Sequence, residues 1–184
     1  MDNINLRVIR ESFGRVVYSH KTHEKEAEIQ SCYAKCSKWV NVILVTLTSS
    51  SLVGALVTTQ KNYVIASAVC SALALAAVIF QLSFSPDEKA ERHKQAANLL
   101  WFIRERYVNL MADIQNESIT SAEIISRRDA VLRELDVVYK SAPATSPTAY
   151  KSARTALKIR EELTFTDAEI DQFLPEGLKS HHSE

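Results

Sequence analysis

Two stretches of sequence decide the fold: Trp39–Gln60, WVNVILVTLTSSSLVGALVTTQ, and Tyr63–Phe84, YVIASAVCSALALAAVIFQLSF. Neither stretch contains a charged residue, and only Lys61 and Asn62 separate them. At 1.5 Å per residue, each would form a helix of roughly 30 Å, the thickness of a bilayer core. Because so short a linker can join only antiparallel neighbours, the sequence predicts a hairpin of two transmembrane helices within residues 39–84.

Aromatic and basic residues near the two stretches predict the orientation of this hairpin. Trp39, Tyr63 and Phe84 lie at helix ends, where aromatic side chains anchor helices at the membrane interface. The turn carries only Lys61, whereas the flanks carry Lys35, Lys38, Lys89, Arg92 and Lys94. The positive-inside rule therefore places both termini in the cytoplasm. The alternative is a buried helical hairpin in a soluble protein, which two consecutive uncharged runs of this length disfavour.

The remainder of the chain is charged but balanced. Its 22 basic and 22 acidic residues create no net field that would attract nucleic acid or acidic substrates. Gly and Pro are scarce and no segment alternates with period two, so we expect an all-α fold. We predict one domain over residues 1–184, with cytoplasmic lead helices in 1–38, cytoplasmic helices in 85–179 and a disordered tail in 180–184.

Small and hydroxyl-bearing residues suggest that the hairpin does more than anchor the chain. Thr46, Ser50 and Gly54 form one small-residue line, and Ala68, Ala72 and Ala76 form another. Such lines let helix backbones approach closely. Packing within the hairpin explains one line, while the other would serve neighbouring copies or a wetted pore. The candidate pore-lining or helix-packing residues are Asn41, Thr46, Thr48, Ser49, Ser50, Ser51, Gly54, Ser67, Ala68, Ser71, Ala72 and Ala76.

The segments on either side of the hairpin are predicted to be helical. Residues 4–35 show the pattern of one or two amphipathic helices, which Gly14 or the polar run Ser19–Thr22 could interrupt. Glu24–Lys38 is expected to continue directly into the first span. After the hairpin, Ser85-Pro86-Asp87-Glu88 predicts a helix start, with the serine as N-cap and proline in the first helical position.

The helix that begins there carries apolar residues at alternating four- and three-residue steps, a spacing typical of a coiled coil. This stripe must pack on another helix. The simplest partners are the N-terminal helix of the same chain or the same helix of a second copy. The candidate oligomer or partner interface is therefore Ala96, Leu100, Ile103, Tyr107, Leu110 and Ile114.

Three further helices are predicted from their start signals. Thr120-x-x-Glu123 begins a helix that runs to about Tyr139, where Ala142-Pro143 stops it. Ser146-Pro147 begins the next, which is expected to reach about Leu163. A last short helix begins at Thr166-x-x-Glu169 and ends near Phe173.

Catalytic motifs are absent from the sequence. There is no glycine-rich phosphate loop and no Ser, His and acid spacing for nucleophilic catalysis, so we expect neither an enzyme nor a cofactor. His20, His23, Cys32 and Cys36 could in principle hold zinc, but buried helix cysteines, or unmodified or acylated juxtamembrane cysteines, are the favoured interpretation. His93 is predicted to pack between helices, with a gating or sensing role as the alternative. The basic residues of the C-terminal helices alternate with acids, which favours a solvated face over a nucleotide or partner site: Arg127, Arg128, Arg133, Arg154, Lys158 and Arg160.

The order of these segments resembles the SLATT family, the two-transmembrane effector domains associated with SMODS and SLOG proteins in bacterial defence loci. The resemblance covers nearly the whole chain. It rests on a lead helix that runs into a hairpin with a minimal turn, and on soft motifs in the cytoplasmic part. These motifs are His93 with Ala96-Ala97, the Ala142-Pro143 break, and an end formed by Thr166–Asp171, Phe173-Leu174-Pro175 and Leu178.

This resemblance implies a function. A SLATT effector would oligomerise and permeabilise or disrupt the bacterial inner membrane once a separate protein senses infection. That partner would be a nucleotide-signal synthase, a SLOG protein or a reverse transcriptase. The alternative is a non-conducting scaffold that binds and regulates a neighbouring defence enzyme. Whether the chain itself binds nucleotides or nucleic acid stays open.

Overall fold

The structure, a computed structural model, describes residues 4–58, 60–175, 177 and 179. In this part of the chain the regular elements are six helices, and no strand occurs. The elements are α1 (Ile4–Thr58), α2 (Lys61–Phe84), α3 (Pro86–Gln115), α4 (Ser121–Ser141), α5 (Pro147–Lys158) and α6 (Asp167–Asp171). The predicted all-α fold is therefore confirmed. The tail predicted to be disordered, 180–184, lies outside the described residues.

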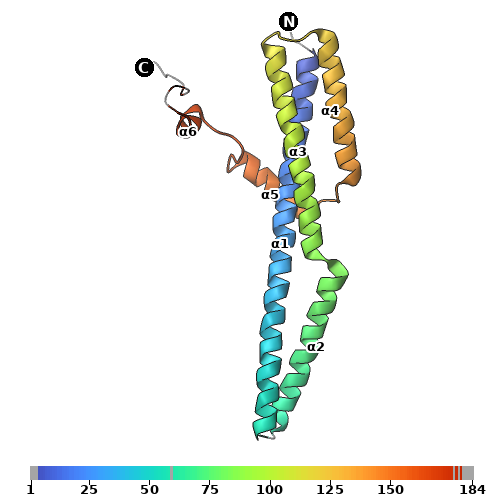
Figure 1. The fold of residues 1–184 in the computed structure, drawn as a ribbon, viewed down its shortest axis with the longest axis vertical. Coiled ribbons are helices and arrows are strands. Elements are labelled where there is room, and N and C mark those ends of the chain that lie inside the picture. Colours follow the sequence, from blue (N-terminus) through green and yellow to red (C-terminus); the bar gives the residue numbers. More distant parts are fainter. Residues whose placement is uncertain (1–3, 59, 176, 178, 180–184) are drawn as a thin grey trace.

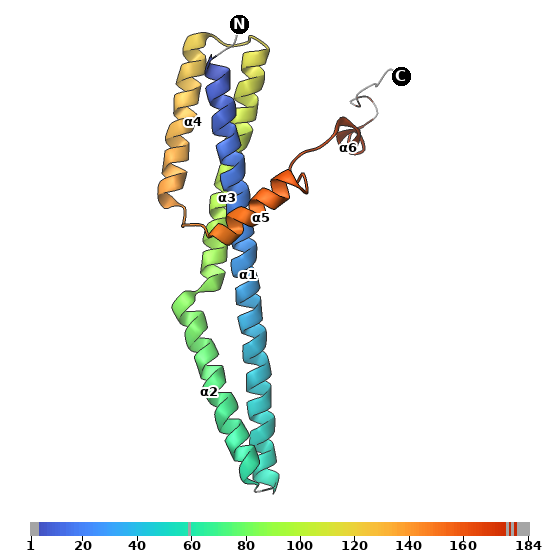
Figure 2. The ribbon, with the colours of Figure 1, turned by 180° about the vertical axis from the view of Figure 1, so that it is seen from behind.

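The molecule is long and narrow because α1 runs along its whole length (Figure 1). At one end α2 returns beside α1 and completes the hairpin. At the other end α3 and α4 pack along the N-terminal half of α1. Figure 2 shows α5 crossing α1 near its middle, and α6 standing apart from the bundle beyond it.

Helix α1 is unbroken from Ile4 into the first span, so the interruptions considered at Gly14 and Ser19–Thr22 do not occur. A Cβ added at Gly14 would meet nothing within 4 Å, so the absence of a side chain relieves no crowding there. The hydroxyl of Thr22 donates to the carbonyl of Tyr18 at 2.7 Å and is satisfied within the helix. The predicted continuation of Glu24–Lys38 into the span is confirmed.

The junction between α2 and α3 differs from the prediction. Ser85 has φ 41° and ψ 57°, a left-handed conformation, and its side chain makes no capping bond to α3. Its N–H instead donates to the carbonyl of Gln81 at 2.9 Å and ends α2. Ser85 is nevertheless the N-cap residue of α3, as predicted, since its carbonyl accepts the N–H of Lys89 at 3.1 Å, and Pro86 starts α3 with its fixed φ. The chain bends at this point (Figure 1).

Two side-chain contacts tie α1 to this bend. The Nε2 of Gln81 donates to the Oγ of Ser37 at 2.8 Å. On the other side of the bend, the Nζ of Lys38 lies 2.8 Å from the Oδ1 of Asp87. Both contacts are made by residues of α1 just before the first span, at the boundary between the hairpin and the rest of the bundle.

The remaining helix starts are those predicted. The N–H of Thr120 donates to Glu123 Oε2 at 3.1 Å, and the Glu123 N–H donates back to the Thr120 hydroxyl at 3.3 Å. Thr166 begins α6 with the same capping box. Helix α5 ends at Lys158, earlier than predicted, because the backbone turns through positive φ at Glu161 and Leu163.

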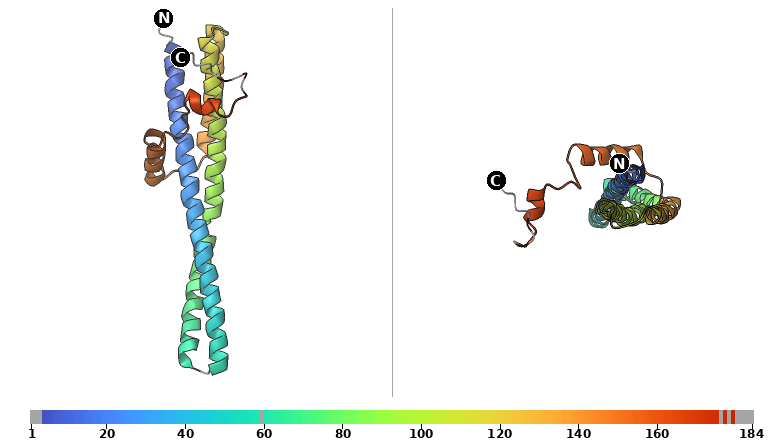
Figure 3. Two further views of the ribbon diagram at one scale, coloured as in Figure 1. Left: turned by 90° about the vertical axis from the view of Figure 1, so that its left-hand side faces the viewer. Right: turned by 90° about the horizontal axis from the view of Figure 1, so that it is seen from above.

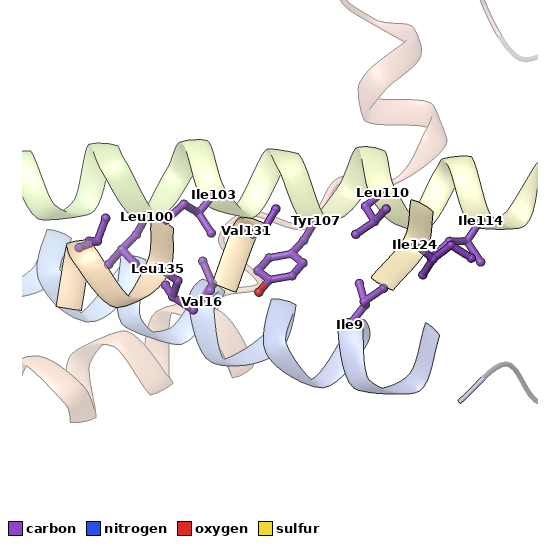
Figure 4. Close-up of a cluster of buried hydrophobic side chains, with 11 residues drawn as sticks. Ile9, Val16, Leu100, Ile103, Tyr107, Leu110, Ile114, Ile124, Val131 and Leu135 are labelled. Carbon is purple, nitrogen blue, oxygen red and sulfur yellow. The ribbon is translucent and has the colours of Figure 1, made fainter. Parts of the chain in front are cut away.

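The coiled-coil stripe of α3 packs inside the chain. Figure 4 shows its residues between α1 and α4, where Ile9 and Val16 approach from α1 and Ile124, Val131 and Leu135 from α4. Of the two partners expected for the stripe, the one found is the N-terminal helix of the same chain. Helix α4 packs against the stripe as well. The stripe residues are therefore not a free surface in this arrangement: Ala96, Leu100, Ile103, Tyr107, Leu110 and Ile114 are all buried.

The packing of this core predicts that two adjacent leucines, one buried and one exposed, contribute differently to stability. We expect Leu100→Ala to lower the free energy of unfolding of the helices outside the hairpin by about 3 kcal/mol, because removing a fully buried leucine side chain leaves a cavity. Leu99→Ala, at a position that is 51 % exposed, should change it by less than about 1 kcal/mol. Thermal unfolding in detergent, followed by circular dichroism, measures both. Equal losses in the two variants would contradict this packing.

Candidate functional site

The hairpin exposes its apolar side chains. Helix α1 and the helical stretch that begins at Lys61 each contain a window long and apolar enough to cross a membrane, and no residue of either window is buried in the chain. Leu56 and Val57 near the turn are both 77 % exposed. Such a surface is far larger than soluble monomers leave uncovered, whereas in a bilayer it contacts lipid. A buried hairpin in a soluble protein would need other segments to cover this surface. No segment in the described part of the chain covers it.

The helices of the hairpin meet through small and polar side chains. Among the described residues, only α2 lies beside α1 at this level, so reduced exposure identifies the facing sides (Figure 1). Gly54 lets the Tyr63 ring approach closely, since a Cβ would lie 3.1 Å from Cδ1 of that ring and the ring would have to shift. The candidate residues that lie in this interface are Asn41, Thr48, Ser51, Gly54 and Ser67.

The other candidate residues of the hairpin face outward. The line Thr46–Ser50–Gly54 is split, because Gly54 packs on Tyr63 while Thr46 and Ser50 are exposed. The alanine line of α2 is exposed as a whole. The outward set is Thr46, Ser49, Ser50, Ala68, Ser71, Ala72 and Ala76.

The hydroxyl groups of the first span are compatible with a membrane. Thr46 donates to the carbonyl of Val42 at 2.8 Å, and Ser49 donates to that of Val45 at 3.0 Å. These bonds within the helix satisfy the hydroxyl protons, so the side chains enter lipid without an unpaired donor. Asn41 differs, because its Oδ1 is buried and has no hydrogen-bond partner among the described residues.

A second candidate site lies outside the hairpin, where α1, α3 and the start of α5 meet. Polar side chains are buried here although polar groups usually remain at the surface unless they are paired. We call this group the buried polar cluster: His20, Lys21, Thr22, His23 and Glu26 of α1 and His93 of α3.

Two histidines form the centre of the buried polar cluster. The Nδ1 atoms of His23 and His93 lie 3.0 Å apart, so one ring donates a proton and the other accepts it. The Nδ1 of His20 donates to the carbonyl of Ala97 at 2.9 Å. Burial lowers the pKa of His23 to about 4 and also lowers the pKa of His93. The pair is therefore neutral at neutral pH and joins α1 to α3.

Glu26 connects this centre to α5. Its Oε2 accepts the N–H of Ser146 at 2.9 Å and the hydroxyl of Ser146 at 2.5 Å. Gln30 donates to the other carboxylate oxygen at 2.9 Å. Burial opposes the charge of Glu26, but these donors outweigh burial and hold its pKa below the ordinary value. Because Ser146 is the N-cap of α5, Glu26 fixes the start of that helix on α1.

Lys21 attaches the residues that follow α5 to α1. Its Nζ lies 2.8 Å from Glu24 Oε2 and 2.6 Å from Glu162 Oε2. Burial would lower the pKa of Lys21, yet the bonds to the two carboxylates raise it above the ordinary value. The segment 146–162 is therefore attached to α1 at both of its ends, on two adjacent turns of the helix.

The structure decides between the alternatives for the remaining candidates. His93 packs between helices as predicted, and sequence reasoning missed its partner His23, which is 70 positions away. The zinc constellation does not form, since His20 and His23 are buried while Cys32 and Cys36 are exposed. Among the described residues, no group of three or more His, Cys, Asp or Glu could hold a metal ion.

The basic residues of the C-terminal helices form a solvated face, as predicted. Arg127 pairs with Asp113 at 2.8 Å across α3 and α4. Arg128 lies 2.9 Å from Asp129 and donates to Asn5 at 3.0 Å. These guanidinium groups therefore interact with neighbours of the same chain.

Comparison with known proteins gives one match. The profile of the SMODS and SLOG-associating 2TM effector domain family 4 matches residues 6–169. This range holds the hairpin, the α3 core and every residue of the buried polar cluster. No curated protein and no solved structure matches the chain.

The histidine pair predicts a pH dependence of stability. The native pKa of His23 is about 4, below the ordinary 6.5, so the unfolded chain binds more protons between these values. Stability should be full above pH 6.5 and fall by up to roughly 3 kcal/mol as the pH drops to 4. His23→Phe, which keeps a ring at the site, should flatten this dependence in thermal unfolding at pH 7 and pH 5. Identical slopes in both proteins would contradict it.

The attachment of α5 predicts a local effect. Glu26→Ala removes the acceptor for both donors of Ser146, so the amides of residues 146–158 should exchange hydrogen at least about tenfold faster. Glu28→Ala is the matched control, because Glu28 lies half a turn away and pairs with Lys25. Hydrogen exchange with mass spectrometry measures both. Unchanged exchange in the Glu26 variant would show that other contacts hold α5.

Proposed function

This chain belongs to the SMODS and SLOG-associating 2TM effector domain family 4, and from that premise we propose that it forms homo-oligomeric pores in the bacterial inner membrane. Both termini lie in the cytoplasm in this proposal, as the basic flanks of the hairpin suggest. Opening follows a signal of phage infection and kills the infected cell. The protein acts by changing membrane permeability, without a catalytic step or a cofactor.

This proposal rests on the hydroxyl groups of the first span that face away from α2. Thr46, Ser49 and Ser50 are exposed on the side of α1 that faces away from α2. A span that only anchored the chain would gain nothing from hydroxyl groups facing lipid. Around the axis of an oligomer, the same groups would face a water-filled path and supply acceptors to it.

The outward alanine line of α2 supports assembly. Ala68, Ala72 and Ala76 leave room for a second helix to approach closely, which is how helices associate in lipid. If α2 of one copy packs beside α1 of the next, the contact is heterologous and closes into a ring.

Control comes from the cytoplasmic half. The buried polar cluster joins α1, α3 and the ends of the α5 segment just before α1 enters the membrane. We propose that a separately encoded protein acts on these helices and thereby rearranges the hairpins. The family description associates these domains with SMODS and SLOG proteins, so a nucleotide-signal synthase or a SLOG protein is the first candidate, and a reverse transcriptase is another.

A scaffold without conduction is the second candidate function. Large apolar side chains are exposed on the outer sides of α3 and α4, among them Phe102, Leu132 and Val137. Such a surface fits a neighbouring defence enzyme that the chain would bind and regulate. In that case the hairpin serves as an anchor, and the outward hydroxyl groups have no role.

The two faces of the first span separate these functions. Thr46→Val, Ser49→Ala and Ser50→Ala together remove the outward hydroxyl groups with little change in volume, and should reduce depolarisation at least about tenfold. Thr48→Val with Ser51→Ala removes hydroxyl groups from the hairpin interface and should reduce it less than about threefold. A membrane-potential dye in cells that carry the neighbouring defence genes, challenged with phage, gives the readout.

Two results would refute the pore. One is that infected cells die while their membranes stay polarised. The other is that both sets of substitutions leave depolarisation unchanged, which would favour the scaffold. Equal amounts of each variant in the membrane fraction are the control for expression and insertion.

A further inference from the structure

An open groove of about 850 Å³ follows α1 from the cytoplasmic half to the start of the first span. Its lining residues on α1 recur every three or four positions from Glu24 to Ile43, a length of roughly 28 Å along the helix. Lys94, Ala97 and Asn98 of α3 form the other wall at the cytoplasmic end. We call this the juxtamembrane groove.

Lipid can cover only one end of the juxtamembrane groove. Trp39, Val40 and Ile43 belong to the charge-free span, where they contact the bilayer. Ala27, Cys32 and Cys36 line the same groove but lie before Lys38, on the cytoplasmic side of that boundary. An apolar surface at this position faces water unless a protein segment covers it.

The charges around the groove indicate the kind of segment that fits. Glu24 and Glu28 are paired within α1, with Lys21 at 2.8 Å and Lys25 at 3.1 Å. Lys35 and Lys94 are exposed and form no ion pair in the described part of the chain. The cations that remain uncompensated in the groove would therefore attract a segment that is both apolar and acidic.

The chain itself contains a segment of this kind. Residues 165–174, FTDAEIDQFL, carry Asp167, Glu169 and Asp171, and no Lys or Arg occurs between positions 161 and 178. Phe165 and Phe173 are 65 % and 82 % exposed, so large apolar side chains of this segment lack cover. The right-hand view of Figure 3 shows α6, the centre of this segment, apart from the bundle.

We propose that the segment Phe165–Leu174 of one copy docks in the juxtamembrane groove of a second copy. The attachment of Glu162 to Lys21 places the segment beside the groove of its own chain, yet in the single chain it points away from it. From Glu162 to Leu174, with α6 helical and the flanking residues extended, the chain spans roughly 30 Å, nearly three times the diameter of a helix, and so reaches an adjacent copy. The acidic side chains meet Lys35 and Lys94, and the phenylalanines cover the apolar wall.

Native cysteines in the groove provide a direct test in the full chain. One version carries Phe173→Cys with Cys32, Cys36 and Cys70 replaced by Ser. The other keeps Cys32 and Cys36 and carries only Cys70→Ser. When the two versions, with different tags, are produced together and membranes are oxidised mildly, a disulfide-linked heterodimer is expected. Tyr150→Cys in place of Phe173→Cys is the matched control, at an exposed position on α5, and should give at least fivefold less heterodimer.

Charge reversal tests the recognition itself. Lys35→Glu with Lys94→Glu should reduce the heterodimer at least fivefold, and Asp167→Lys with Asp171→Lys in the other version should restore it. Equal yields from Phe173→Cys and Tyr150→Cys overturn the proposal. So does a disulfide that forms only within one chain when Phe173→Cys, Cys32 and Cys36 are combined. The assay needs no ion conduction, so its result is independent of the pore.

Discussion

One continuous helix has to satisfy two different solvents, and the rest of the structure is arranged around that constraint. In its N-terminal half, α1 packs its apolar residues on α3 and α4 and its buried polar residues on α3 and α5. In its second half the same helix exposes apolar side chains and turns small or polar ones to α2. Among the described elements only α1 extends through both parts, so α2, α3, α4 and α5 are each positioned by the part of α1 that they contact.

The hairpin and the buried polar cluster are therefore connected by one continuous helix, α1. The buried polar cluster ends at Glu26 and the first span begins at Trp39, a separation of roughly 20 Å along an unbroken helix. Between them lie the juxtamembrane groove and the contacts of Ser37 and Lys38 with the bend at Ser85. A helix of this length transmits rotation as well as displacement. A change in how α3 and α5 hold α1 would thus alter which face of the first span meets a neighbouring hairpin.

Sequence reasoning succeeded where a single segment carries the whole signal. The absence of charge defined the spans, and the threonine and glutamate spacings defined the starts of α4 and α6. It failed where the outcome depends on two segments. Ser85 lies in a pattern typical of an N-cap, but its N–H bonds to the carbonyl of Gln81 and ends the preceding helix, and its side chain makes no capping bond. Periodicity aligned Thr46, Ser50 and Gly54, yet only the position of Tyr63 shows that Gly54 faces α2 and the other two do not.

The buried polar cluster shows the same limit, since His23 and His93 are ordinary residues until the fold brings their rings together. A different consequence follows from the bend at Ser85. The chain bends between α2 and α3 at the membrane boundary, whereas α1 continues through it without a break. Helix α1 would therefore tilt as one rigid rod about a point near Trp39. The part of α1 outside the span is about 52 Å long, so a tilt of about 10° in the bilayer would move its far end by about 9 Å. Bilayer thickness or tension would thereby act mechanically on α3, α4 and α5.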